Sequence, residues 1–515
     1  MIDFSPTRRV LSLPLIQVGL PALAVLLAVA IARLPLPLVA GLLAAAAVLL
    51  LTVVRPLFGL GMALLLGPFG ALESVILGNP PLDSGQLALL LTFAAWLGAG
   101  LARRRLIIPA SSFNLPWLLW LGVAAFSLVG APSIPLGLVE LLKWLEIGLI
   151  VWLILDVAAD PDRPGGYVRT TRALLVALLA AGVLQAAIGI WQFGLRGTGP
   201  EHFIVLGRFY RAYGTFEQPN PFGGYMNLVA LLALGTLWGL LATRFTNRVT
   251  GEGLFRPARF WVPFVTVCAL AASLALVLSW SRGAWLGFLA GLAVLALFST
   301  RRVLAGGALL AVAGVVLGAG IYLGVSAGIG PALAVADRLG GFGDEFALGD
   351  ARGVDINDAN YAVIERLAHW QAAVDMARDD LWTGVGFGNY PAAYPAYALI
   401  NFPDALGHAH NYYLNLLAEV GLPGLLAYAL FWLAIVVQTI RVCRRLEWPE
   451  RGVAVGLLAA WAALAVHHLV DKLYVNNIYV HLGAMFGLLQ LLAWPSLWAE
   501  TEPGQPAENA GWSDR

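Results

Sequence analysis

Apolar runs of about 20 residues recur along nearly the whole chain, and they constrain its fold more than any other feature. A helix needs roughly 20 apolar residues to cross the hydrocarbon core of a bilayer. The 515-residue chain is 60% hydrophobic and only 12% charged, whereas about 25% of the residues of a soluble domain are charged. We therefore predict an all-α integral membrane protein with many spanning helices.

About fourteen segments have spanning length. They lie near residues 11–32, 36–54, 57–77, 85–102, 115–131, 136–157, 173–195, 221–243, 260–280, 283–299, 303–325, 410–440, 452–470 and 474–494. Gly67-Pro68 interrupts the third, and Leu422-Pro423-Gly424 lies in the long segment near 410–440, where the proline is expected to kink or split a helix. The expected architecture is a polytopic bundle of about 12–14 transmembrane helices.

Positive charge is distributed unevenly among the predicted loops. Arginines cluster at 103–105, 244–259 and 441–451, while the short loops at 79–85 and 131–135 contain no Lys or Arg. Because positively charged loops stay on the cytoplasmic side, both termini are predicted to be cytoplasmic.

This topology divides the chain into four parts. Residues 1–325 form a bundle of about eleven spans, and residues 410–494 add the C-terminal transmembrane helices. The segment 326–409 between them lies outside the membrane and carries eleven acidic residues against four arginines. Apolar residues three and four apart predict an amphipathic helix over 360–380 within it. The polar tail 495–515 is expected to be disordered.

Two weaker patterns lead to no site. Cys268 and Cys443 are far apart in apolar runs, so neither a disulfide framework nor a cysteine metal site is expected. The glycine-rich stretch 384–388 resembles a nucleotide-binding loop, but no βαβ pattern surrounds it, and we reject that interpretation.

Several cations fall on the predicted outer side, where positive charge is disfavoured. They include Arg208, Arg211, Arg282 and Lys472. An arginine fork binds phosphate in a bidentate manner and keeps its charge, so these positions suggest an anionic ligand. For Arg282 the alternative is a side chain that reaches the lipid headgroups, and Arg211 is equally consistent with an ordinary loop charge.

A His-x-His-Asn sequence opens the apolar run near 410–440. A histidine there is suited to exchanging a proton near neutral pH. A capping or packing role is the alternative for both His408 and His410. We expect one of them to be catalytic, and His410 is favoured because it directly precedes the helix.

A second group of potential ligands lies near the end of the thirteenth predicted span. His467, His468 and Asp471 would form a metal site together with the His408/His410 pair only if the fold joined them. Their spacing matches no standard motif, so we predict no metal. Glu419, nine residues after His410, is expected to support packing.

The motifs as a set resemble the O-antigen ligase and polymerase superfamily. They are SWSRGAWLGFLAG (279–291), RLAHWQAAVDMARDDLWTGVGFGNY (366–390) and HAHNYYLNLLAEVGLPGLL (408–426), preceded by YRAYGTFEQPNPFGGYMNL (210–228). The resemblance covers roughly 205–440.

This resemblance implies a GT-C-like membrane glycosyltransferase of the bacterial cytoplasmic membrane, active on the extracytoplasmic side. Such an enzyme transfers a glycan from an undecaprenyl-diphosphate-type lipid to a glycan, lipid or protein hydroxyl, without a metal, another cofactor or nucleic acid. Arg211 and Arg282 would hold the diphosphate, and His410 would orient or deprotonate the acceptor. The expected substrate-binding residues around them are Arg208, Arg366, Trp370, His408 and Asn411.

Three alternatives stay open at this stage. A polysaccharide polymerase shares the donor and the motifs with a ligase. A small-anion transporter is the alternative of another class, and it would have discontinuous helices and charges in mid-span. A catalytically silent scaffold is the third. The glycan, the acceptor, the linkage and the oligomeric state are not encoded in these patterns.

Overall fold

The structure is a computed structural model. It describes residues 35–104, 108–160, 165–244, 254–298, 351–352, 356 and 361–494, without the side chains of residues 244, 258 and 362. The predicted spans 11–32 and 303–325, the tail 495–515 and the predicted boundary at 325–326 lie outside these residues.

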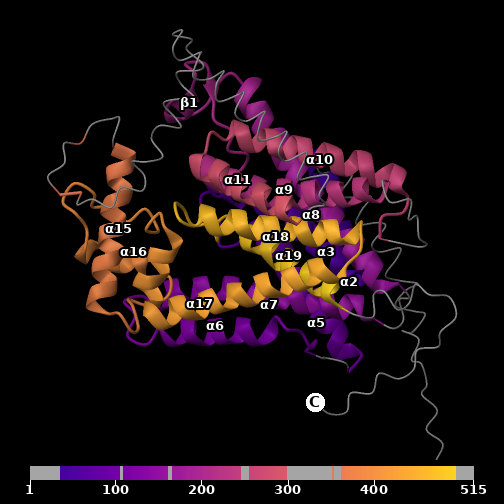
Figure 1. Cartoon of the computed structure of the whole chain (residues 1–515), viewed down its shortest axis with the longest axis horizontal. Coiled ribbons are helices and arrows are strands. Elements are labelled where there is room, and N and C mark those ends of the chain that lie inside the picture. Colours follow the sequence, from indigo (N-terminus) through magenta and orange to yellow (C-terminus); the bar gives the residue numbers. More distant parts are fainter. Residues whose placement is uncertain are drawn as a thin grey trace, which may run out of the picture.

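Helices make up most of the described chain, and strands are almost absent from it (Figure 1). The bundle contains α2 (Leu36–Val54), α3 (Pro56–Leu66), η1 (Gly67–Phe69), α4 (Gly70–Leu77), α5 (Ser84–Ala102), α6 (Asn114–Phe126), α7 (Ile134–Ala158), α8 (Gly166–Gly194), α9 (Pro219–Arg244), α10 (Ala258–Leu278), α11 (Arg282–Leu297), α17 (Tyr412–Arg445), α18 (Glu450–His467) and α19 (Ile478–Ala493). Smaller elements are η2 (Glu201–Phe203), the antiparallel hairpin β1 (Ile204–Val205) and β2 (Phe209–Tyr210), α15 (Tyr361–Asp379), α16 (Tyr390–Ala393) and η3 (Tyr394–Ala396). The prediction of an all-α polytopic membrane protein is confirmed.

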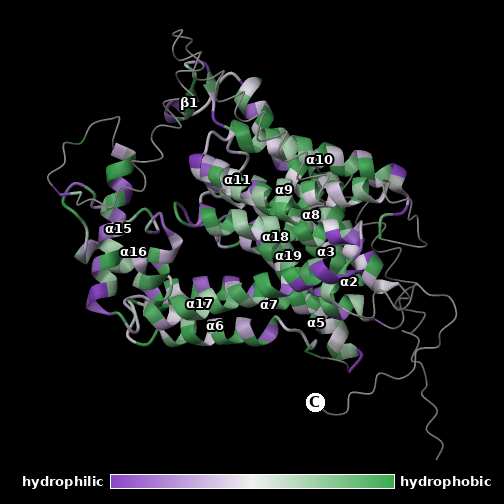
Figure 2. Ribbon diagram, in the orientation of Figure 1, coloured by the Kyte–Doolittle hydropathy of each residue, from purple (hydrophilic) through white to green (hydrophobic). Residues whose placement is uncertain are grey.

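Within the described residues, eight helices are long and apolar enough to cross a membrane, and α6, α11 and α19 are shorter apolar helices. Figure 2 shows apolar residues along most of the bundle helices. The helix α7 has spanning length, but its first half carries Glu140, Lys143 and Glu146. In the span formed by α3, η1 and α4, Gly67-Pro68 produces only one turn of 3-10 helix. A proline is tolerated there because the backbone N–H that it lacks has no acceptor in the first turn of a helix. The assignment of the two ends of the bundle to the two sides of the membrane remains a prediction.

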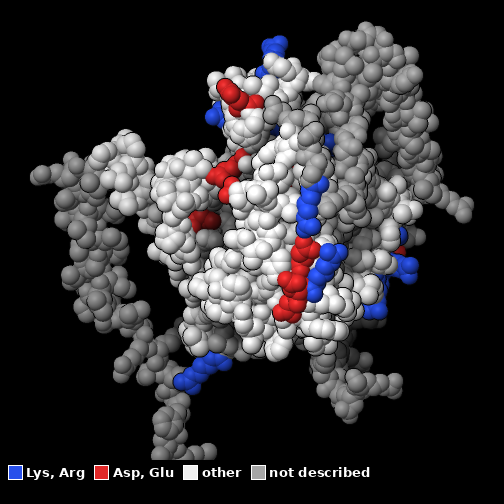
Figure 3. Space-filling view, turned by 90° about the vertical axis from the view of Figure 1, so that its left-hand side faces the viewer, with Lys and Arg blue, Asp and Glu red and all other residues white. Residues whose placement is uncertain are grey.

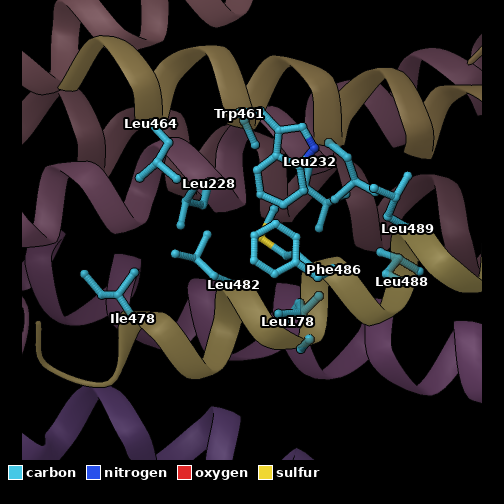
Figure 4. Close-up of a cluster of buried hydrophobic side chains, with 14 of the residues drawn as sticks. Leu178, Leu228, Leu232, Trp461, Leu464, Ile478, Leu482, Phe486, Leu488 and Leu489 are labelled. Carbon is cyan, nitrogen blue, oxygen red and sulfur yellow. The ribbon is translucent and has the colours of Figure 1, made fainter. Parts of the chain in front are cut away.

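The helix α18 lies at the centre of the bundle, packed against α9, α11 and α17. Glycines allow α9 and α18 to approach closely: a Cβ added at Gly235 would lie 2.4 Å from the Cα of Gly456. Small residues at such crossings let helix backbones pack tightly in a membrane. Beside this crossing, large side chains of α8, α9, α18 and α19 interdigitate around Trp461 and Phe486 (Figure 4).

The helix α17 is broken, as the proline-containing stretch predicts. The break lies at Gly421, where φ is 64° and ψ is −172°. The glycine-rich loop 384–388 fills it, because Val385 N–H donates to Ala418 O at 2.9 Å and Gly386 N–H donates to Glu419 O at 2.8 Å. The loop that looks like a nucleotide site is therefore a structural insert that satisfies the carbonyls of an interrupted helix.

The amphipathic helix predicted over 360–380 is α15, and it packs against α17 at one end of the bundle (Figure 1). Its buried residues include Ile364, Ala368, Trp370 and Met376. Figure 3 views this end of the molecule and shows acidic and basic side chains interleaved in a strip. In α15, Asp375 pairs with Arg378 at 2.9 Å, so part of the acidic charge predicted for the segment 326–409 is locally neutralised.

Candidate active site

The turn between α10 and α11 holds Arg282. Ser279 ends α10, and the side chain of Ser281 caps α11 by accepting a hydrogen bond from Ala284 N–H. Both serines are buried, because their hydroxyls satisfy helix ends rather than facing lipid. Arg282 is the first residue of α11, where the helix dipole adds to the positive charge of the guanidinium.

Arg211 reaches the same turn from the segment after β2. Its Nε donates to Ser279 O at 3.0 Å, and its Nη2 donates to Asn220 Oδ1 at 3.3 Å. The backbone is held there as well, because Ala212 N–H donates to Leu278 O at 2.9 Å. The two arginines predicted to bind the donor therefore meet at one turn, although 71 residues separate them in the sequence (282 − 211).

A pocket beside this turn brings in a third arginine from α15. Its lining residues are Asn220, Ser281, Arg282, Gly283, Arg366, His467 and Val470. Arg211 does not line the pocket itself but bonds to Asn220, which does. We call these residues together with Arg211 the arginine pocket. Two guanidinium groups line this cavity, and a third is bonded to one of the lining residues. Such a cationic group is suited to a multiply charged anion such as a diphosphate.

His408 and His410 lie in the loop that leads into α17. The backbone N–H of His410 donates to Nδ1 of His408 at 3.0 Å, and the two rings are 4.4 Å apart. His410 has a φ of 52°, an uncommon value that turns the chain sharply before the helix. Asn411 is the N-cap of α17, and its Oδ1 accepts from the N–H groups of Tyr413 and Leu414 at 3.1 Å each. Its observed contacts are those of a capping residue.

Burial keeps the two histidines neutral. It lowers the pKa of His410 to about 3, with further contributions from the cation of Arg366 and from His369. Burial, His410 and Lys472 hold the pKa of His408 well below its ordinary range. Each ring therefore offers a lone pair at neutral pH and is a weak base in the absence of substrate.

His369 of α15 completes an aromatic group around His410. Its ring lies 5.6 Å from that of His410 and stacks on Tyr394 at 4.7 Å. Its Nδ1 forms a hydrogen bond of 3.0 Å with the hydroxyl of Tyr390. Burial lowers the pKa of His369 to about 4. The helix α15 thus supplies Arg366 to the arginine pocket and, three residues later, His369 to the histidine pair.

Three of the five potential metal ligands considered from the sequence converge. Donor atoms of His408, His410 and Asp471 lie within 4.8 Å of one another. Because Nδ1 of His408 accepts a backbone N–H, its neutral ring carries the proton on Nε2, which faces Asp471 Oδ1 at 3.6 Å. A metal at Nε2 would have to displace that proton beside the cation of Lys472, so this donor set fits a His–Asp pair better than a metal centre.

The other two residues of that set lie apart. His467 lines the arginine pocket. The ring of His468 contacts Tyr412 at 4.9 Å, and its carbonyl oxygen accepts from Tyr412 N–H at 2.8 Å. Asp471 therefore joins the histidine pair without His467 or His468.

Lys472 corrects one expectation. Its place on the disfavoured side suggests an anionic ligand, but its ammonium pairs with Glu140 of α7 at 3.2 Å. Both side chains are nearly buried, and the same carboxylate also contacts Lys143 at 2.6 Å. The anion that balances Lys472 belongs to the protein itself.

Two predicted substrate-binding residues do not line the arginine pocket. Arg208 is exposed in the turn of the β1–β2 hairpin, with its guanidinium 5.4 Å from the ring centroid of Phe209. Trp370 is buried within α15, and its Nε1 has no hydrogen-bond partner among the described residues. Their roles toward substrate remain predictions.

Residues 267–429 match the model of a protein family described as O-Antigen ligase. This part of the chain is similar to the O-antigen ligase family. No curated protein matches the chain. The matched region contains Arg282, Arg366 and the histidine pair, whereas Arg211 and Asp471 lie outside it, so flanking parts of the bundle contribute to the candidate site.

Sequence reasoning missed several residues of the site. His369, Asn220 and Tyr390 lie inside the motifs that carry the family resemblance, but their spacing alone gives no sign that they approach Arg211 or His410. An ion-pair partner for Glu140 could have been predicted, because an unpaired carboxylate in an apolar spanning segment is costly.

Proposed function

We propose that this protein transfers a glycan from an undecaprenyl-diphosphate-type lipid to an acceptor hydroxyl at the outer face of the bacterial cytoplasmic membrane. The observation that carries the proposal is the arrangement of the arginine pocket beside a neutral histidine pair. Arg366 and His369 on one helix connect the two. A cationic pocket for a leaving diphosphate next to a proton acceptor is what this displacement requires.

In the proposed reaction the acceptor oxygen attacks the anomeric carbon of the donor sugar. The bond from that carbon to the diphosphate oxygen breaks, and its electron pair leaves with the diphosphate. Arg211, Arg282 and Arg366 stabilise the negative charge on the leaving group. The hydroxyl proton passes to the free nitrogen lone pair of His410 and then to solvent, so the enzyme returns to its starting state.

The low pKa of His410 fits this sequence of events. The cation of Arg366 is one of the causes that depress it. A bound diphosphate would neutralise Arg366, raise the pKa of His410 and strengthen it as a base only when the donor is present. This coupling would limit unproductive reactions in the absence of the donor.

Two features expected of a transporter, charges within a spanning helix and a discontinuous helix, are present, but both are bonded to groups of the protein itself. Glu140 and Lys143 lie in α7, but Glu140 pairs with Lys143 and with Lys472. The break of α17 at Gly421 is filled by the loop 384–388. Transporters use such charges and breaks to bind substrate, whereas here protein groups occupy them, which favours the enzyme.

The test is surface-glycan profiling of producing cells that carry wild-type protein or His410→Ala at equal membrane levels. We expect the variant to accumulate lipid-diphosphate-linked glycan and to lose at least about a hundredfold of the finished glycoconjugate, since removing a general base costs about 10²–10⁴ in rate. His202→Ala is the matched control, because His202 is exposed near η2, and it should retain the wild-type profile.

Stalled glycan length separates the two reactions that share this donor. Long stalled chains indicate a ligase, and single repeat units indicate a polymerase. An unchanged profile in His410→Ala would contradict the transferase proposal, and an uptake assay for small anions would then be the next measurement.

A further inference from the structure

A buried ion pair connects the loop 468–477 to the helix α7. Lys472 Nζ lies 3.2 Å from Glu140 Oε1, and the side chains are only 7% and 12% exposed. The anchor is reinforced from the same helix, because Lys143 Nζ contacts Glu140 Oε1 at 2.6 Å and donates to Tyr474 O at 3.4 Å. Two segments more than 300 residues apart in the sequence are thereby fixed to each other (472 − 140).

The anchored residue also holds the carboxylate that faces the histidine pair. The backbone N–H of Lys472 donates to Asp471 Oδ1 at 2.8 Å. That same oxygen lies 3.6 Å from Nε2 of His408, whose Nδ1 accepts from the N–H of His410. A shift of Lys472 would therefore move Asp471, and through it the ring of His408.

A second route leads from Lys472 to the other side of His410. The carboxylates of Glu140 and Glu419 raise the pKa of Lys472 against the opposing effect of burial, so Glu419 lies within electrostatic range. Glu419 Oε1 accepts from the N–H of Tyr390 at 3.1 Å, and the Tyr390 hydroxyl bonds to His369. Lys472 is thus linked to both neighbours of the histidine that we propose as the base.

We infer that Lys472, held by Glu140, is a positioning residue that sets the orientation of His408 and His410. The inference rests on the proposed transferase function and adds a residue that lies outside the matched family region. A buried ion pair is a poor source of stability, because desolvation of both charges opposes it. The role that fits this pair better is positioning, because the contact between Lys472 and Glu140 holds the loop 468–477 in one position against α7.

The experiment compares Lys472→Met, Lys472→Arg and the matched control Lys143→Met. In Lys472→Met the carboxylate of Glu140 keeps Lys143 as a partner, so Glu140 is not left unpaired and the protein is expected to fold. In Lys143→Met the same carboxylate keeps Lys472, and the link to Asp471 remains. Thermal unfolding of the purified proteins in detergent verifies that all three are folded.

The first readout is glycan transfer by each variant, measured as for His410→Ala. We expect Lys472→Met to lose about tenfold to a hundredfold, because a misplacement of about 1 Å can lower a rate a hundredfold. Lys472→Arg should recover most of the activity, and Lys143→Met should lose less than about threefold. Equal losses in Lys472→Met and Lys143→Met would overturn the inference, because they would reflect only general loss of the ion pair.

The second readout does not depend on activity. Diethyl pyrocarbonate modifies neutral, accessible histidines, and mass spectrometry gives the rate at His408 and at His410. We expect at least about a threefold faster modification in Lys472→Met, and wild-type rates in Lys472→Arg and Lys143→Met. Unchanged rates in Lys472→Met would overturn the positioning role. If the wild-type protein transferred no glycan, the proposed function would fail, and this readout would still decide the inference.

Discussion

The arginine pocket and the histidine pair lie next to each other, yet the arginine side chains of the first are charged and the histidine side chains of the second are neutral. Arg211 donates to a carbonyl oxygen and to an amide oxygen, and a guanidinium group stays protonated at neutral pH. His410 is kept neutral by burial and by the cation of Arg366. The arginine pocket therefore carries a permanent positive charge, whereas the histidine pair offers a nitrogen lone pair.

The two regions are also supported differently. The arginine pocket is built on a single turn, where Ser279 and Ser281 satisfy the helix ends. The histidine pair depends on the fit of α15, α17 and the loop 468–477 around it. We therefore expect the arginine pocket to respond to changes of chemistry and the histidine pair to respond to changes of geometry.

The largest expected effect comes from Arg282→Lys. The substitution keeps the charge but removes the planar fork, so bidentate contact with a phosphate is lost. We expect kcat/KM for the lipid-diphosphate donor to fall about a hundredfold or more, a magnitude typical for a lost donor at a developing oxyanion. Arg196→Lys is the control, because Arg196 is exposed and bonds to Tyr213. Full activity of Arg282→Lys would reduce its role to a simple point charge.

Arg366→Gln tests the electrostatic link between the two regions. The Arg366 cation lowers the pKa of His410, so its removal should raise that pKa and bring protonation of His410 to a higher pH. We expect the acid limb of kcat/KM, which reports free enzyme, to move upward in pH. Arg378→Gln on the same helix, where Arg378 pairs with Asp375, should leave the limb in place. An unchanged acid limb in Arg366→Gln would show that Arg366 and His410 are not electrostatically coupled.

Gly421→Ala tests the geometric support of the histidine pair. At φ 64° a side chain is strained, and a Cβ would lie 2.6 Å from Leu381 O. We expect a loss of about 1–3 kcal/mol in the free energy of unfolding, measured by thermal or denaturant unfolding in detergent, with a partial loss of transfer. Gly98→Ala is the control, because a Cβ at Gly98 meets nothing within 4 Å among the described atoms. Equal stability of the two variants would contradict a strained break in α17.

The smallest effect is expected for Arg208→Ala. Arg208 is exposed at the hairpin turn and stacks on Phe209 rather than lining the arginine pocket. We expect less than a twofold change in donor KM and in glycan transfer. A tenfold rise in KM would indicate that the hairpin contacts the bound donor, and would place Arg208 with the residues of the pocket.

The sequence by itself determined the features that depend on local composition and periodicity. Apolar runs of spanning length are confirmed as helices wherever the structure describes them, because burial in lipid leaves the helix as the main way to satisfy the backbone. The same holds for the interruption of α17 and for the helix α15. Arg282 and His410 could be selected as candidate site residues from the sequence, because charged and titratable groups beside membrane helices are costly; their roles stay predictions.

Only the tertiary structure decided which of these groups meet. Asp471 joins His408, and Lys472 finds its counter-ion in Glu140. The buried face of α15 follows from its contact with α17 and not from apolar residues alone. Such pairings join segments that are dozens to hundreds of residues apart, and they depend on how helices of similar apolar character are ordered in the bundle. Apolar periodicity is nearly the same for every span, so it specifies that each helix forms but not which helix lies beside it.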